Sequence, residues 1–138
     1  METVFDKIIR KELPAEIIYE DDLVIAFLDM FPDNPGHTLF IPKDPCENML
    51  CTSDEALARI VSVAKKIAPA ILAAVGATGF NFITNNGSVA GQAVMHTHFH
   101  LIPRFEQDGL KGWEHHDVPS DKLSEQRKNI CALITECI

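Results

Sequence analysis

Hydrophobic residues repeat along the chain with two different periods, which separate helices from strands. Between Asp54 and Val75 they recur every three or four residues, as at Leu57, Ile60 and Val61, which is typical of an amphipathic helix. Shorter runs rich in β-branched and aromatic residues are bounded by turn residues and predict strands. The pattern predicts strands over 17–20, 23–29, 37–42, 79–84 and 94–103, and further helices over 4–12 and 120–137. Because few helices interrupt the strands, we expect an α+β fold with a mainly antiparallel sheet.

Local signals mark where these elements begin and end. Pro14 follows the first predicted helix, and Ser53 and Asp54 are both suited to cap the long helix. Pro69 lies inside the long helix and predicts a kink or a division there. After Arg104 the pattern weakens into an irregular tail before the last helix. We predict a single domain over 1–138, with a core that ends near residue 104 and a C-terminal tail and helix over 105–138.

The charge and apolar content narrow the range of partners. The 138 residues carry a formal net charge of −8, whereas a general nucleic-acid surface needs clustered Lys and Arg. Backbone N–H groups and a few side chains can still hold a small phosphate. No apolar run is long enough to cross a membrane, and the N-terminus lacks a signal-peptide pattern. We therefore expect a cytoplasmic protein with no nucleic-acid or membrane partner.

The four cysteines, Cys46, Cys51, Cys131 and Cys137, include no CxxC pair. For a cytoplasmic chain we expect free thiols, buried or half-exposed. A zinc site or a disulfide framework is the alternative.

Residues 94–102 contain more candidate catalytic side chains than any other segment. Three of the six histidines lie there and alternate with other residues. On a strand, His96, His98 and His100 would share one face, while Phe99 and Leu101 would help form an apolar core face. One interpretation is a solvated strand face, although chance explains so many histidines poorly. Another is a metal site, although the outer two residues would be roughly 13 Å apart and would converge poorly on one tetrahedral zinc ion. We favour nucleophilic catalysis by His98, oriented by its neighbours.

The His96-x-His98-x-His100 sequence, followed by Leu101 and Ile102, resembles the signature of the histidine triad (HIT) family. Other landmarks follow in the family's order and spacing: residues 4–14, Ala26-Phe27-Leu28-Asp29, Pro35-Gly36-His37, Asn85-Asn86-Gly87 and Gly91-Gln92. The resemblance extends over about residues 4–104 and is closest to the branch of nucleoside phosphoramidate hydrolases. It implies a histidine-triad-like fold with a long helix and a C-terminal helix, assembled as a homodimer.

The resemblance implies that His98 attacks the α-phosphate of a purine nucleotide and forms a nucleotidyl-histidine intermediate, which water then cleaves. A neutral imidazole suits this step because the ordinary pKa of histidine is about 6.5. The family pattern also implies that a main-chain carbonyl near His96 fixes the tautomer of His98, and that His100 and His37 lie near the phosphate. Neither a cofactor nor a metal is required by these residues.

The resemblance also assigns residues to the nucleotide. Asp29 would accept both ribose hydroxyls, a task that suits an acceptor-only carboxylate. Asn85 would contact the phosphate side of the ligand. The amides of the segment from Gly91 through Gln92 to Val94 would stabilise charge on the phosphoryl oxygens, although Gly91 also suits a simple turn. The residues that match the family's base pocket are Val4, Phe5, Ile8, Phe27 and Met30.

The predicted function is hydrolysis or transfer at the α-phosphate of a purine nucleotide, of the phosphoramidate or adenylated-amine type. Two departures from the family pattern bear on it. Ala93 stands where the closest branch commonly has a serine that aids the leaving group. Thr3 and Asp6 stand where many bacterial members have a zinc-binding cysteine pair, so we predict no structural zinc.

Two alternative functions stay open. Gln92 is compatible with a dinucleoside polyphosphate hydrolase, a branch in which a glutamine also precedes the triad. An alternative of another class is a nucleotide-binding interaction module with little turnover.

Overall fold

The structure, a computed structural model, describes residues 1–137, and its contacts divide the chain into the units Met1–Asp108 and Gly109–Ile138. The elements of the first unit are α1 (Val4–Ile9), β1 (Ile17–Glu20), β2 (Val24–Leu28), β3 (Thr38–Pro42), α2 (Asp54–Val75), β4 (Gly79–Thr84), η1 (Ser88–Ala90) and β5 (Phe99–Arg104). The second unit contains α3 (Ser120–Cys137). Every helix and strand predicted from the sequence is present, although several ends are shifted.

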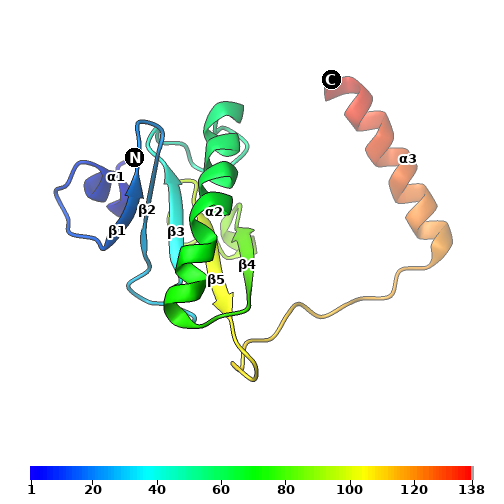
Figure 1. The fold of residues 1–138 in the computed structure, drawn as a ribbon. Helices are drawn as coiled ribbons and strands as arrows, with labels where there is room; N and C mark the ends of the chain where they lie inside the picture. The colour runs from blue at the N-terminus through cyan, green and yellow to red at the C-terminus, as the bar shows by residue number, and fades with distance from the viewer. Residues whose placement is uncertain (138) are drawn as a thin grey trace. The chain divides into compact units, whose positions relative to one another are not determined.

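The first unit is built on one antiparallel sheet with strand order β1-β2-β3-β5-β4 (Figure 1). Helix α2 packs on one face, where Ile60 meets alternate residues of the strands such as Ala26 and Phe40. On the other face, Phe5 and Ile8 of α1 join a second apolar cluster. Because both faces are covered, β2 and β3 are almost continuously buried. The prediction of an α+β fold with a mainly antiparallel sheet is confirmed.

Capping interactions set the bounds of α2. The Ser53 hydroxyl accepts a hydrogen bond from the Ala56 amide at 3.2 Å, so Ser53 is the cap and Asp54 is the first helical residue. Gly76 ends the helix in the left-handed region, with φ at 76°. The helix runs through Pro69 without a division.

Helix α1 is shorter than predicted. It ends at Ile9 because Lys11 takes a left-handed φ of 64°, and the amides of Glu12 and Leu13 both donate to the Lys7 carbonyl. The sequence carried no glycine to announce this turn.

The strand predicted over 94–103 begins only at Phe99, so its N-terminal end was predicted wrongly. Pairing with β3 reaches Phe40 opposite Phe99 and stops there. Pro42 has no N–H to continue the ladder, and its carbonyl instead accepts a hydrogen bond from Nε2 of His96 at 2.8 Å. Residues 94–98 therefore follow the loop after β3, where the amide of Thr97 donates to the Cys46 carbonyl at 2.8 Å.

Two cysteines also depart from the expectation of free thiols, because Cys46 and Cys51 form a disulfide. Their Cα atoms are 5.9 Å apart, within the usual range for such a bond. The intervening chain is folded back by the Asn48 carbonyl, which accepts from the Cys51 amide and from Oγ1 of Thr52. Spacing alone does not reveal such a turn.

In the second unit, the Cys131 side chain is exposed on α3, and so are the side chains of Trp113, His115 and His116 in the segment before it. Cys137 belongs to the last residues, whose side chains lie outside the description. Among the described residues, no helix combines the length and apolar character needed to cross a bilayer.

The disulfide generates a first prediction. Replacing both Cys46 and Cys51 by serine should lower the free energy of unfolding by about 2 kcal/mol, because opening a short loop restores chain entropy to the unfolded state. Urea denaturation followed by circular dichroism measures the change. Wild-type protein unfolded with dithiothreitol is the matched control and should lose the same amount. An unchanged denaturation midpoint in both experiments would contradict the bond.

Candidate active site

The four candidate catalytic histidines lie beside the sheet face that α1 covers; His100 belongs to β5, while His37, His96 and His98 precede β3 or β5. His100 pairs with Leu39, which belongs to the apolar cluster on that face. His37, His96 and His98 are all buried, with at most 5% of each side chain exposed. The ring centroids of His98 and His100 are 4.9 Å apart, and those of His37 and His100 are 5.1 Å apart. The structure therefore brings together the histidines singled out from the sequence.

One hydrogen bond fixes the proton on His98. Its Nδ1 lies 2.7 Å from the His96 carbonyl oxygen, which can only accept. Nδ1 therefore carries the hydrogen, and Nε2 keeps a lone pair. The backbone carbonyl of His98 accepts from Oγ1 of Thr84 at 2.7 Å, which holds the same residue from its other side. Burial lowers the pKa of His98, so the ring is neutral and nucleophilic near pH 7.

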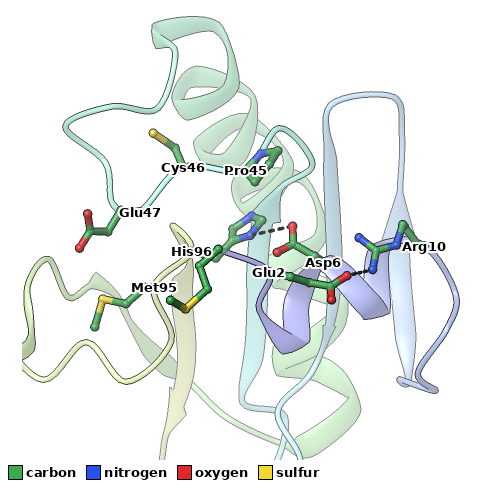
Figure 2. A pocket seen from close by; sticks show the side chains of 9 residues that line it. Glu2, Asp6, Arg10, Pro45, Cys46, Glu47, Met95 and His96 are labelled. Atoms are coloured by element: carbon green, nitrogen blue, oxygen red, sulfur yellow. Dashed lines mark hydrogen bonds and ion pairs between the residues drawn. The ribbon is translucent and has the colours of Figure 1, made fainter.

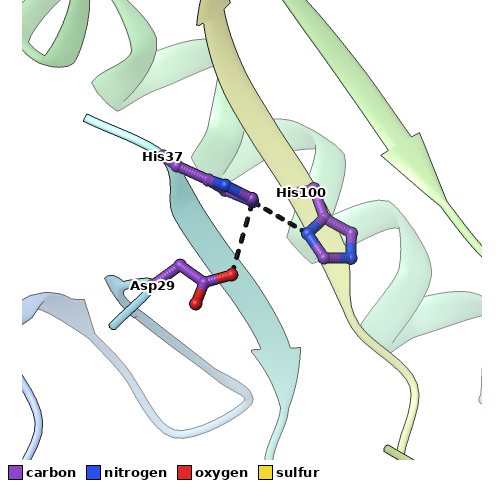
Figure 3. Close-up of side chains that lie close together, drawn as sticks. All are labelled: Asp29, His37 and His100. Atoms are coloured by element: carbon purple, nitrogen blue, oxygen red, sulfur yellow. Dashed lines mark hydrogen bonds and ion pairs between the residues drawn. The ribbon is translucent and has the colours of Figure 1, made fainter. Parts of the chain in front are cut away.

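A second set of bonds fixes the protons on His37 and His100 (Figure 3). The Asp33 amide donates to Nδ1 of His37 at 3.0 Å, so the His37 hydrogen lies on Nε2. That Nε2 is 2.9 Å from Nδ1 of His100 and donates to it. The His100 hydrogen must then lie on its Nε2. Burial, with further contributions from His98 and His37, lowers the pKa of His100 to about 4, so this ring too is neutral at pH 7.

Gly36 lets the chain place His37 in this network. Its φ of 85° is in the left-handed region, which disfavours any side chain. A Cβ there would also lie 3.1 Å from Cγ of Pro103 and 3.1 Å from Cγ1 of Val75. The glycine of the Pro-Gly-His landmark therefore has a packing reason as well as a conformational one.

Asp29 follows β2 and faces the same cluster. Its Oδ2 is 3.6 Å from Nε2 of His37, while Oδ1 accepts from the Phe31 amide at 2.9 Å. Its own amide donates to the His37 carbonyl. About 20% of its side chain is exposed, so the carboxylate can reach a ligand.

The structure describes a group of three side chains that offer metal-ligand atoms within 4.8 Å of one another: Asp29, His37 and His100. Tetrahedral zinc with bonds of about 2.0–2.1 Å would hold two ligand nitrogens about 3.3 Å apart. The 2.9 Å separation of the His37 and His100 nitrogens, and the amide on the other His37 nitrogen, fit a hydrogen-bonded pair instead.

The segment that leads into the histidines is a tight turn. The amides of Gly91 and Gln92 donate to the carbonyls of Ser88 and Gly87 at 3.0 and 3.1 Å. Gly91 has a φ of 93°, which confirms it as a turn glycine, and the Asn85 side chain lies beside it. Both amides thus donate within the turn, and their contact with a phosphate stays a prediction.

The Gln92 side chain is buried and acts as a brace. Its Nε2 donates to the carbonyls of Glu47 and Val94 at 2.6 and 3.0 Å, and its Oε1 accepts from the Gly87 amide at 2.8 Å. The side chain thus ties the loop after β3 to the turn before the triad.

The expected base-pocket residues separate into two groups. Phe5, Ile8 and Phe27 are buried in the cluster under α1, and Val94 packs against that cluster. The Phe5 ring meets the His98 ring edge-on, with centroids 5.0 Å apart. The other two residues, Val4 and Met30, lie outside this cluster and are 45% and 79% exposed.

Sequence reasoning missed several groups that position the histidines. Pro42 and Thr84 act through hydrogen bonds to His96 and to the His98 backbone. Thr97 is buried and bonds Oγ1 of Thr52 at 2.7 Å, which fastens the segment between the first two triad histidines. Pro42 carries no sequence signal for its role, because any residue has a carbonyl.

Comparison with known proteins identifies the family. The HIT domain family model matches residues 10–107. An adenylylsulfatase of Arabidopsis thaliana, HINT3, is 40% identical over 141 residues, which cover 96% of this chain and 72% of that protein. The adenosine 5'-monophosphoramidase hnt1 of Schizosaccharomyces pombe is 36% identical over 136 residues, covering 97% of this chain and 99% of that protein.

Comparison with solved structures leads to the same family. The crystal structure of a histidine triad nucleotide-binding protein from Candida albicans superposes with a TM-score of 0.89, at 30% identity. The match covers 99% of this chain and 100% of that chain. The resemblance seen in the triad and its landmarks is therefore confirmed: the chain belongs to the HIT family.

Proposed function

We propose that the protein hydrolyses or transfers the nucleotidyl group of a purine nucleotide, such as AMP bearing an amine, through a nucleotidyl-His98 intermediate. The observation that carries the proposal is the hydrogen bond from Nδ1 of His98 to the His96 carbonyl, which leaves a neutral Nε2 free to attack. The names of the plant and fission-yeast relatives, an adenylylsulfatase and an AMP phosphoramidase, describe chemistry at the same phosphorus.

In the first step, Nε2 of His98 forms a bond to the α-phosphorus, and the bond from phosphorus to the leaving group breaks. The leaving group departs with the electron pair and must gain a proton. His98 becomes cationic, and the His96 carbonyl on Nδ1 stabilises that charge. Water then forms a bond to phosphorus and loses a proton to solvent, while the bond from Nε2 of His98 to phosphorus breaks. This releases the nucleotide and returns His98 to its neutral form.

His100 is suited to assist both steps. Its Nδ1 is occupied by the donor from His37, so its Nε2–H can donate a hydrogen bond to a phosphoryl oxygen as negative charge develops there. Ala93 supplies no hydroxyl for leaving-group protonation. The leaving group therefore takes its proton from water, because a neutral His100 that gave up its one hydrogen would become an imidazolate. Because a histidine supplies the nucleophile directly, we propose that no metal or cofactor takes part.

The remaining ligand contacts follow the same arrangement. Asp29 is proposed to accept the ribose hydroxyls, and Asn85 beside the Gly91 turn is proposed to face the phosphate. The purine would lie against the apolar cluster that includes Phe5, Phe27 and Val94. The cytoplasmic location and the absence of nucleic-acid partners stay predictions from the sequence.

We also propose a homodimer, for which the sheet edge offers support. β4 is one of the two outer strands of the sheet, the other being β1, and antiparallel edges can pair with their own copy about a two-fold axis. An apolar groove lies beside it between α2 and β4, and Val61 and Phe80 at this groove are 54% and 45% exposed. A second copy is an occupant that would cover these side chains.

A panel of substrates separates the alternatives. Adenosine phosphoramidate, adenylyl sulfate and a diadenosine polyphosphate should be compared with the same purified protein. We expect the highest kcat/KM for the phosphoramidate. Preferential cleavage of the dinucleotide would favour the polyphosphate hydrolase instead. Tight AMP binding without turnover of any substrate would favour a binding module.

The nucleophile is tested by His98→Ala. Turnover should fall at least ~10³-fold, equivalent to ~4 kcal/mol of barrier, while AMP binding by calorimetry is retained. His116→Ala, in the exposed tail, is the matched control and should keep full activity. A His98→Ala variant that keeps a tenth of wild-type turnover would exclude His98 as the nucleophile.

The lowered pKa of His98 predicts the pH dependence of kcat/KM. The neutral ring attacks, and burial shifts its protonation to below about pH 6.5. The profile should therefore be flat through neutral pH and should fall tenfold per unit only below the lowered pKa. Initial rates between pH 4.5 and 8.5, in buffers of constant ionic strength, give the profile. An acid limb that begins above pH 7 would show a raised pKa and contradict this arrangement.

The ribose role of Asp29 is tested by comparing AMP with 2′-deoxy-AMP. Wild-type protein should prefer AMP by roughly 1–3 kcal/mol, because the deoxy sugar leaves an acceptor unpaired. In Asp29→Ala the two affinities should nearly converge, and four dissociation constants by calorimetry complete the cycle. Equal binding of both nucleotides to wild-type protein, or a preference that survives the substitution, would contradict the ribose role. Asp29 would then be only the residue that follows a strand.

A further inference from the structure

His96 is the one triad histidine whose ring does not face the other histidines. It is 1% exposed, and its Nε2 donates to the Pro42 carbonyl. Within the described part of the chain, its Nδ1 is buried without a hydrogen-bond partner. The nearest acidic atom is Oδ1 of Asp6, at 3.6 Å (Figure 2). A buried polar atom left in this way needs a physical explanation.

The location of one proton supplies that explanation. The Pro42 carbonyl only accepts, so Nε2 of His96 carries a hydrogen in any protonation state. If the ring were neutral, its bare Nδ1 would face a carboxylate oxygen, and two acceptors would oppose each other. A second hydrogen on Nδ1 turns this contact into a charge-assisted pair between His96 and Asp6.

The surroundings favour the charged pair. A cavity of about 660 Å³ borders both side chains, and its charged lining residues besides these two are Glu2, Arg10 and Glu47. Arg10 is already paired with Glu2. Counting Asp6, the lining carries three carboxylates against the Arg10 guanidinium and the α-amino group of Met1, so it offers a partner for an imidazole N–H at Nδ1 of His96.

We propose that Asp6 is a positioning residue for His98, acting through an ion pair with His96. This inference rests on the proposed function. The pair and the Pro42 bond hold the His96 ring from both nitrogens, and the backbone carbonyl of His96 is the group that fixes the His98 tautomer. Asp6 thus selects which nitrogen of His98 is free to attack.

Asp6 also connects the triad to α1. Its Oδ2 accepts from the Thr3 amide at 2.7 Å and lies 3.2 Å from the Thr3 hydroxyl, which caps the helix. One residue earlier, the Phe5 ring packs against the rings of both His96 and His98, with centroids 6.0 and 5.0 Å apart. The short helix and the nucleophile are therefore positioned by the same carboxylate.

The test is Asp6→Asn, which keeps the size of the side chain and an acceptor for Thr3 but removes the charge. We expect kcat for the phosphoramidate to fall about 10- to 100-fold with little change in KM, as when a partner that orients a histidine is lost. Thr3→Ala is the matched control. It removes the hydroxyl contact to the same carboxylate, keeps the backbone donor and should leave kcat unchanged.

Nitrogen-15 NMR of histidine-labelled protein measures directly which ring nitrogens carry hydrogen. In wild-type protein at pH 7, both His96 nitrogens should carry hydrogen, and His98 should show a single Nδ1–H tautomer. In Asp6→Asn, Nδ1 of His96 should lose its hydrogen, and His98 should become a mixture of tautomers. A bare His96 nitrogen in the wild type, or an unchanged His98 spectrum and kcat in the variant, would overturn the inference. The spectra need no turnover, so failure of the proposed function is distinguishable from failure of this role.

Discussion

The backbone ladder between β3 and β5 stops at Phe40 and Phe99, and the geometry of the site depends on that stop. Had the ladder continued, the carbonyls of residues 96 and 42 would have been turned to strand partners. Instead, the Pro42 carbonyl receives the His96 ring, and the His96 carbonyl receives the His98 ring. Two backbone oxygens that would have accepted hydrogen bonds within a sheet therefore orient imidazole rings instead.

The site achieves a defined proton distribution mainly by burial and neutral hydrogen bonds. His98 and His100 are both kept neutral by desolvation, and each has one nitrogen committed to a fixed partner. The acidic side chains stand at opposite ends of the histidine row, Asp6 beside His96 and Asp29 beside His37. The two carboxylates thus contact the outer histidines, while the His98 ring between them is uncharged and held by a fixed hydrogen bond.

Much of this could be predicted from sequence because periodicity and short-range signals reflect local physics. The bounds of α2 follow from helical spacing and a serine cap, and the histidines of the triad were recognisable from their own pattern. Part of what escaped prediction depends on contacts between distant segments. The late start of β5 at Phe99 follows from Pro42, and the orientation of Asp6 towards His96 is equally a tertiary fact. The rest is local turn geometry that residue type alone does not specify, as in the disulfide closed by a turn centred on Asn48 and the Gly91 amide that donates within its own turn.

The loop between β3 and α2 looks like an ordinary exposed connection, yet two of its backbone oxygens, together with that of the last residue of β3, hold the segment before β5. The carbonyls of Pro42 in β3, and of Cys46 and Glu47 in the loop, accept from His96, Thr97 and Gln92 in turn. Surface loops usually tolerate inserted residues. Here one additional residue would move the Cys46 and Glu47 carbonyls out of step with the segment they hold, and the geometry of the site would change without any substitution in the triad. The length of this loop is therefore itself a constraint on the site.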